Sequence, residues 1–258
     1  MIFPRAQSCA NRVNEVLSVP TDTARSAQNV RQHQAKAKLE FRNVTFQYRG
    51  AEEPVLNNIS FTADIGKTTA IIGGTGSGKS TIASLIPRFY DIQSGTIRID
   101  GVNILRIPKQ ELRDKIGFVP QKAFLFSGTI LDNFRHGKKD ATMEEIRKAA
   151  QTAQIAGFID GLEDGYNTRV AQGGNNFSGG QKQRLAIARA LVKKPEIYIF
   201  DDSFSALDFK TDAKLRAALK DEVKDAAVIV VAQRISTIMD AEQIVVLDEG
   251  RVAGTGTH

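Results

Sequence analysis

The chain lacks several features that would place it in other classes of protein. Its 258 residues include one cysteine, Cys9, so no internal disulfide can form and a reducing compartment is indicated. It contains no run of eighteen apolar residues, so no segment is predicted to span a membrane by itself. Met1 to Arg5 lead into a polar stretch without the apolar core of a signal peptide. An apolar content of 41% and a charged content of 25% are typical of a folded soluble domain.

The chain has a small positive net charge, and its basic residues are not clustered in the sequence. The formal net charge is +6, and there is no block of five or more basic residues. Nucleotide phosphates or an anionic membrane surface would explain this charge as well as nucleic acid would. We therefore expect no nucleic-acid partner.

One glycine-rich stretch carries the strongest chemical signal. The pattern Gly-x-x-x-x-Gly-Lys-Ser is complete, and it lies between a β-branched run and a helical segment. Glycines let successive backbone N–H groups point into one concavity, and the start of a helix adds its positive dipole end. We expect the Lys79 ammonium to reach the β- and γ-phosphates and the Ser80 hydroxyl to hold Mg²⁺. The predicted phosphate-binding residues are Gly73, Gly74, Thr75, Gly76, Ser77, Gly78, Lys79, Ser80 and Thr81.

The rest of the chain alternates between strand-like and helix-like patterns. Residues 6–19 are predicted to form a short amphipathic helix, 21–38 a linker, and 39–258 the folded unit. Strands in the folded unit are expected near residues 39–48, 59–62, 69–72, 96–101, 116–120, 197–200, 227–231 and 243–247. Helices are expected after Lys79, between residues 129 and 162, and over 181–191. The uninterrupted apolar run at 227–231 is typical of a parallel strand covered on both faces. This order predicts an α/β fold in which residues 122–180 form an inserted helical subdomain.

A second magnesium anchor is predicted at the end of a neighbouring strand. Four apolar residues, 197–200, are followed directly by Asp201 and Asp202. Such a strand places Asp201 at the carboxyl edge of the sheet, beside the phosphate loop.

A third motif identifies a family. The sequence Asn-Phe-Ser-Gly-Gly-Gln-Lys-Gln-Arg over residues 176–184 resembles the signature of the nucleotide-binding domain of ATP-binding-cassette (ABC) transporters, with Phe177 where leucine is usual. The resemblance covers residues 39–258. It implies a phosphate-loop NTPase (RecA-like) core with an antiparallel β subdomain and the inserted helical subdomain. Ser178, Gly179, Gly180 and Gln181 begin a helix, so they could form a second anion site. Each ATP of a head-to-tail dimer would then lie between one chain's loop and the other chain's signature.

The resemblance also assigns roles to shorter motifs. Tyr48 is similar to the aromatic residue that stacks on adenine, and Gln121 to the glutamine that joins the Mg²⁺ and water shell to the transmembrane partner. Residues 205–208 are similar to the loop that meets the opposite subunit. Phe124 and Phe126 would offer an apolar patch where a coupling helix of the membrane domain docks; local core packing is the alternative.

Two positions depart from the family pattern. Asp202 stands where the family usually has a glutamate that polarises the attacking water, and Gln233 where it usually has a histidine at the γ-phosphate. Retracting a carboxylate by about 1 Å costs on the order of 100-fold in rate when catalysis depends on positioning. Our hypothesis is that this chain is the degenerate half of a heterodimeric exporter, hydrolysing ATP slowly in its own site. The alternative is a homodimer that tolerates both residues.

The sequence therefore predicts the ATP-binding, Mg²⁺-dependent domain of a multidrug- or lipid-type ABC exporter. Asp202, Gln233 and Gln121 are the predicted catalytic residues, and Ser80, Gln121 and Asp201 the predicted metal ligands. Residues 1–20 resemble the extension of the last transmembrane helix, and the end of the chain stops inside a stretch that continues in the family into another helix. The expected location is the cytoplasmic face of the cell membrane. Two alternatives remain: a chromosome-maintenance or repair ATPase acting on DNA, and an ATP-binding module without turnover.

Overall fold

The computed structural model describes residues 3–18, 37–234 and 237–258. Most of the predicted linker, residues 21–38, lies outside this range. A helix α1 (Phe3–Leu17) confirms the predicted N-terminal helix, and its apolar residues Val13, Val16 and Leu17 are exposed. Within the described ranges, no helix has both the length and the apolar character needed to cross a membrane.

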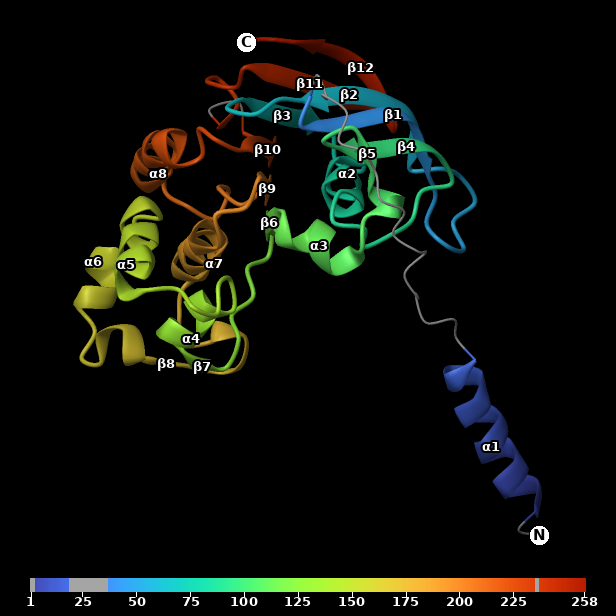
Figure 1. The fold of residues 1–258 in the computed structure, drawn as a ribbon, viewed down its shortest axis with the longest axis horizontal. Coiled ribbons are helices and arrows are strands. Elements are labelled where there is room, and N and C mark those ends of the chain that lie inside the picture. The colour runs from blue at the N-terminus through green and yellow to red at the C-terminus, as the bar shows by residue number, and fades with distance from the viewer. Residues whose placement is uncertain (1–2, 19–36, 235–236) are drawn as a thin grey trace.

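The strands of the described part form three sheets (Figure 1). An antiparallel sheet has the order β2-β1-β4-β5, and a larger sheet has the order β12-β11-β3-β10-β9-β6. A short pair, β7 and β8, lies in the helical region. The strands are β1 (Leu39–Phe46), β2 (Leu56–Ala63), β3 (Thr68–Gly73), β4 (Ser94–Ile99), β5 (Val102–Asn103), β6 (Ile116–Val119), β7 (Gly128–Thr129), β8 (Arg169–Val170), β9 (Ile197–Asp201), β10 (Ala227–Val231), β11 (Gln243–Asp248) and β12 (Arg251–Gly256).

The larger sheet is parallel from β6 to β11, and only β12 runs antiparallel to its neighbour. Strand β10 lies between β3 and β9, and Val231 is in register with Ile71 on one side and Asp201 on the other. The carboxyl ends of β3, β10, β9 and β6 therefore meet at one edge. The segments that leave this edge carry the phosphate loop, Gln233, Asp202 and Gln121.

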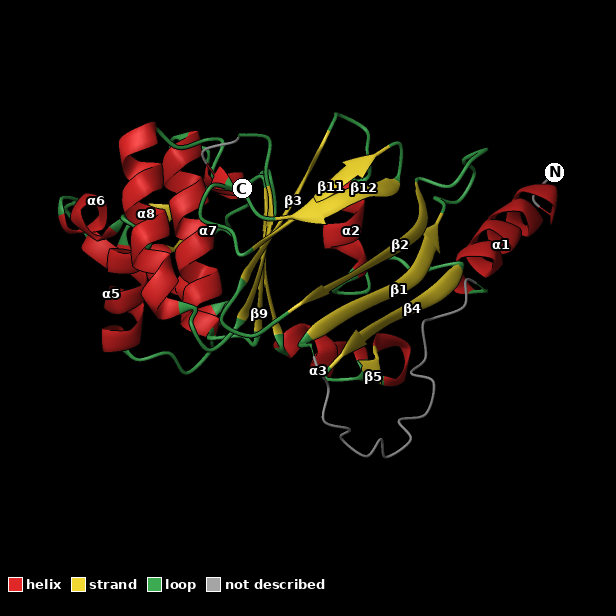
Figure 2. Cartoon of the chain, turned by 90° about the horizontal axis from the view of Figure 1, so that it is seen from above, coloured by secondary structure: helices red, strands yellow, loops and turns green. Residues whose placement is uncertain are grey.

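Helices cover both faces of this sheet, as Figure 2 shows from above. Helix α2 contacts β9 and β10 on one face, while α7 packs on β6 and, with α4 and α5, builds the helical region. The helices are α2 (Lys79–Leu85), α3 (Lys109–Asp114), α4 (Ile130–Arg135), α5 (Met143–Thr152), α6 (Ala156–Asp160), α7 (Gly179–Lys193) and α8 (Phe209–Glu222), with short 3-10 turns at Ile104–Arg106, Gly165–Asn167 and Gln172–Gly174.

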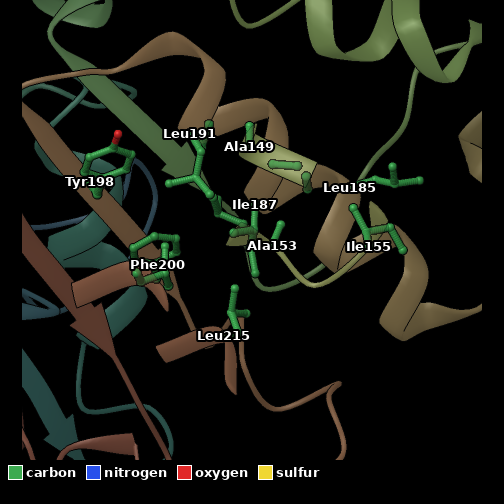
Figure 3. Close-up of a cluster of buried hydrophobic side chains, with 14 of the residues drawn as sticks. Ala149, Ala153, Ile155, Leu185, Ile187, Leu191, Tyr198, Phe200 and Leu215 are labelled. Carbon is green, nitrogen blue, oxygen red and sulfur yellow. The ribbon is translucent and has the colours of Figure 1, made fainter. Parts of the chain in front are cut away.

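The alternation of side chains along the central strands divides the interior into two cores. Ile199 of β9 and Ile229 of β10 face the antiparallel sheet and α2, whereas Phe200 and Val230 face the helical region. Figure 3 shows the core on the helical side, in which Leu185 and Ile187 of α7 gather with Ala153, the residue that follows α5, and Leu215 of α8. Each central strand is buried on both faces, which is why its sequence reads as a continuous apolar run.

The structure confirms the predicted fold class and adds elements that the sequence pattern did not reveal. Helix α8 begins after Asp208, whose carboxylate accepts from the Thr211 backbone N–H, and its apolar residues are too sparse to make an obvious stripe. Strand β12 occupies residues for which no strand was predicted, and it is exposed along most of its length. Both elements form through tertiary pairing: α8 on the helical core and β12 on β11.

Candidate nucleotide-binding site

The backbone of the phosphate loop requires glycine at two points. Gly73 ends β3 with φ +152°, and a Cβ there would collide with the Leu247 carbonyl oxygen of β11. Gly78 adopts φ +95° at the residue before α2, where a Cβ would collide with the Leu56 side chain. Gly74 and Gly76 meet no such obstacle, so their freedom serves the loop conformation and the access of a ligand to the backbone.

Lys79 lies folded against its own loop. Its ammonium donates to the carbonyl oxygens of Gly73 at 2.8 Å and Gly74 at 2.6 Å, and it lies 3.4 Å from the Ser77 hydroxyl. Burial lowers the pKa of this ammonium, against the opposing charges of Asp202 and Asp201. A buried cation in a glycine-rich loop is suited to an anion with several oxygens.

Ser80 and Asp201 come together as predicted. The Ser80 hydroxyl donates to Asp201 Oδ1 at 2.8 Å, which joins the start of α2 to the end of β9. Burial raises the pKa of the Asp201 carboxyl; the Ser80 hydrogen bond opposes the rise, Asp202 adds to it, and Lys79 opposes it. Adjacent hydroxyl and carboxylate oxygens are hard ligands of the kind that Mg²⁺ prefers, so these residues fit the ion.

Asp202 sits directly beside this pair in an unusual backbone conformation. Its φ is +46°, and its N–H donates to the Val231 carbonyl oxygen at 2.9 Å, which ties it to β10. Its carboxylate Oδ2 accepts from the Gln121 side-chain amide at 3.1 Å. Gln121 follows β6, so two predicted catalytic residues from strands on the same edge are in contact.

Gln233 belongs to the fourth segment that leaves this edge of the sheet. It lies two residues after the end of β10 and its side chain is exposed; the Ala232 N–H donates to Ile71 at 3.2 Å and holds the segment beside β3. The residues that immediately follow Arg234 lie outside the described part of the chain.

The signature residues form a capped helix start at some distance along the chain. The Ser178 hydroxyl accepts from the Gln181 N–H at 3.3 Å, and the Gln181 side chain accepts from the Ser178 N–H at 2.8 Å. This reciprocal arrangement is a capping box. Ser178 and Gly179 are exposed, whereas Phe177 is buried in the helical core and fills the position of the usual leucine.

Tyr48 contacts Thr81, the residue that directly follows the phosphate-loop pattern. Its hydroxyl lies 3.1 Å from the Thr81 hydroxyl, and its ring makes edge contacts with Phe46 and Tyr90. These three aromatic residues line a surface hollow of about 430 Å³. An aromatic ring held at this height above the loop can stack on a base.

The match to known proteins decides the family. A family model described as ABC transporter matches residues 56–205, which is more than half of the chain. The chain belongs to the ABC transporter family. The predicted family is therefore confirmed, together with its ATP-binding ATPase domain.

Several longer ABC proteins are similar to this chain. An uncharacterized ABC transporter ATP-binding protein of Mycobacterium tuberculosis is 48% identical over 262 residues, covering 100% of this chain and 44% of that protein. An ATP-dependent lipid A-core flippase of Haemophilus influenzae is 46% identical, covering 87% of this chain and 38% of that protein. The structure of a bacterial Atm1-family ABC exporter with ATP bound superposes with a TM-score of 0.90 at 38% identity, over 99% of this chain and 44% of that one. The chain spans less than half the length of these relatives.

Some residues of the ABC domain site carried no predicted role. Arg234 donates to two carbonyl oxygens of the turn after β9, and Gln183 donates to the Pro120 carbonyl oxygen at 3.2 Å, beside Gln121. Away from this site, at the other end of β9 from Asp201, Lys38 was assigned to the linker but is buried and forms ion pairs with Asp100 and Glu196. Gln183 could have been noticed in the sequence, because it is a polar residue on the apolar side of the predicted helix. No sequence pattern near Arg234 indicated its contacts with the turn after β9.

Proposed function

We propose that this chain is the ATP-binding and ATP-hydrolysing domain of an ABC exporter. The observation that carries the proposal is the convergence of four strand ends: the phosphate loop, Gln233, Asp201–Asp202 and Gln121 leave neighbouring strands at one edge of a parallel sheet. Ligands of open α/β sheets bind at this edge. The triphosphate would contact the loop N–H groups and Lys79, and the base would stack on Tyr48.

Mg²⁺ is proposed to be held by Ser80, Gln121 and Asp201, directly or through water. When bound, the ion would neutralise charge on the phosphate oxygens. The protein groups then have separate tasks. Lys79 exchanges its loop carbonyls for phosphate oxygens, Asp202 orients and accepts a proton from the attacking water, and Gln121 positions Asp202 through its present hydrogen bond.

A second copy of the domain is proposed to complete the site. Ser178 and Gly179 are exposed at the start of the fifteen-residue helix α7, where backbone N–H groups favour an anion. A head-to-tail dimer would place this start over the triphosphate held by the opposite chain. ATP binding would close the dimer and hydrolysis would open it, which is the two-state element that transport requires.

Export is proposed from the relatives and from one surface. The flippase and exporter relatives suggest a membrane domain that precedes this domain, with residues 1–20 as the end of its last helix and the domain on the cytoplasmic face. Phe124 and Phe126 are 52% and 44% exposed and lie close to Gln121 in sequence, so they would receive a coupling helix. A groove of about 240 Å³ lined by Phe89, Phe118 and Arg189 lies nearby, with Arg189 stacked on Phe126.

We further propose that the chain is the slow half of a heterodimer. Asp202 is one methylene shorter than glutamate, and Gln233 cannot carry charge. The partner would supply glutamate and histidine at the matching positions, and Ser178 to Gln181 of this chain would complete the partner's site. A homodimer that tolerates both residues is the alternative.

Steady-state ATP hydrolysis tests both levels of this proposal. Without a partner, the chain should bind MgATP but hydrolyse it slowly. Asp202→Glu combined with Gln233→His should raise the rate on the order of 100-fold if positioning limits catalysis. Brisk turnover by the unmodified chain alone would remove the degenerate-site proposal and leave the exporter proposal intact.

Nucleotide binding separates the remaining alternatives. Trapping of nucleotide without any hydrolysis, in both the unmodified chain and the double variant, would indicate a binding module. Stimulation by DNA would indicate a maintenance ATPase. If the unmodified chain shows no magnesium-dependent affinity for ATP, the proposed function is wrong.

A further inference from the structure

Arg234 lies where two functional segments approach each other. It is the residue next to Gln233, and so belongs to the segment that leaves β10 between the phosphate-loop strand and the Asp201 strand. Its guanidinium contacts the turn that follows Asp202. One nitrogen, Nη2, donates to the Ser205 carbonyl oxygen at 2.7 Å, and the other, Nη1, donates to the Leu207 carbonyl oxygen at 3.3 Å.

The turn that Arg234 holds runs from Ser205 to Asp208. Its first residue is tied to the catalytic edge, since the Ser205 hydroxyl donates to the Asp202 carbonyl oxygen at 2.8 Å. Its last residue caps α8. Between these points Arg234 contacts two alternate carbonyls, and its guanidinium carbon lies 5.4 Å from the Phe209 ring centroid. A planar fork of donors suits two carbonyl oxygens better than the single point charge of lysine.

The same turn packs against the start of the signature helix. A Cβ placed on Gly180 would lie 3.3 Å from the Ala206 carbonyl oxygen and 3.8 Å from the Leu207 side chain. Thus Arg234 is connected on one side to Gln233, in the segment that leaves β10 between β3 and β9. On the other side it is connected through the turn to the signature residues.

We propose that Arg234 is a positioning residue that couples the two nucleotide sites of the dimer. This inference rests on the proposed function, in which the signature faces the opposite chain's ATP. A shift of the segment at Gln233 would move the guanidinium and, with it, the turn and the helix start that cover the other nucleotide. Through its hydrogen bonds to two backbone carbonyl oxygens, Arg234 would link the two sites by an unbroken chain of contacts.

The test compares three variants of the assembled transporter. Arg234→Gln removes the charge and one arm of the fork, and Arg234→Lys keeps the charge without the fork. Arg216→Gln is the matched control, because Arg216 is another partly buried arginine that pairs instead with Asp212 and Asp240. The measurements are MgATP affinity, the ATP concentration that half-closes the dimer, the Hill coefficient of hydrolysis, and the melting temperature.

Arg234→Gln should leave MgATP affinity at its own loop within about twofold, because the Arg234 guanidinium contacts the Ser205–Asp208 turn and the Phe209 ring, not the phosphate loop, among the residues that the structure describes. The ATP concentration for closure should rise about tenfold, as expected for loss of a charged hydrogen bond, and the Hill coefficient should fall toward one. Arg234→Lys should be intermediate, and Arg216→Gln should match the unmodified protein in MgATP affinity, closure and Hill coefficient.

Unchanged closure and cooperativity in Arg234→Gln would overturn the inference. So would Arg234→Lys behaving like the unmodified protein, because charge alone would then suffice. If Arg234→Gln melts too low to assay, Arg234→Lys decides between these results. An unmodified transporter without ATP-dependent closure would instead overturn the proposed function, and the inference with it.

Discussion

The phosphate loop and the signature turn both precede a helix, but their polar groups are satisfied in different ways. Gly78 precedes α2 in a left-handed conformation without any side-chain cap, and the loop carbonyls are bound by the buried Lys79. Ser178 precedes α7 with a complete capping box and is exposed. The start of α2 therefore has no side-chain cap and is held through the Lys79 ammonium, whereas the start of α7 is held by side chains of its own first turn.

The largest expected effect comes from removing the buried cation of the loop. Lys79→Met should lower MgATP affinity on the order of 100-fold or more, because charge-assisted hydrogen bonds to phosphate are lost. The nucleotide-free chain should melt no lower than the unmodified chain, since burial already lowers the pKa of this ammonium and so disfavours its charged form. Calorimetric binding and thermal melting check the two effects. Lys67→Met, at an exposed lysine paired with Asp64, is the control.

The next effect concerns Asp201. Asp201→Asn should abolish most of the magnesium dependence of ATP binding while raising the melting temperature of the nucleotide-free chain near neutral pH. The pKa of this buried carboxyl is raised in the folded state, so its contribution to stability is present at low pH and is lost as pH rises through that pKa. The variant should lack this pH dependence. An equal loss of stability at all pH values would contradict the explanation.

A smaller effect should separate capping from ligand binding at the signature. Ser178→Ala removes the cap and should cost about 1 kcal/mol, which lowers the melting temperature by roughly 2–4 °C. Ser178→Asp keeps a good capping residue but adds a negative charge where the opposite triphosphate is proposed to lie. It should therefore melt like the unmodified chain and yet fail to close with ATP. If Ser178→Asp closes normally, the signature does not face a phosphate.

The smallest effect is expected at a second capping box, which contains a charged glutamate where the signature has Gln181. Thr142 and Glu145 form a capping box at the start of α5, far from either motif in sequence, and Lys138 and Lys194 pair with Glu145. The Lys138 hydrogen bond, the Thr142 N–H and Lys194 lower the pKa of Glu145 from 4.5 to about 2. Glu145→Gln, which reproduces the uncharged box of Ser178 and Gln181, should reduce stability above pH 4.5. The difference from the unmodified chain should vanish as pH falls toward 2, as thermal melts at several pH values would show.

Much of this molecule could be predicted because its motifs are local. The phosphate loop needs glycine at Gly73 and Gly78 for close backbone approach, and this requirement is visible in the sequence. The β9 run and the two aspartates after it are likewise contiguous. The contact between Gln121 and Asp202 and the fork of Arg234 join residues 81 and about 28 positions apart, so no local pattern could reveal them.

Composition and motif order by themselves determined the fold class, the family, and the identity of most residues at the nucleotide edge, because strand and helix periodicities and glycine spacing are short-range properties of a chain. Only the tertiary structure decided which strand ends are neighbours, which carbonyl oxygens Lys79 contacts, and where α8 and β12 form. The reason is that strand order, burial and carbonyl contacts depend on segments that meet only after the chain has folded.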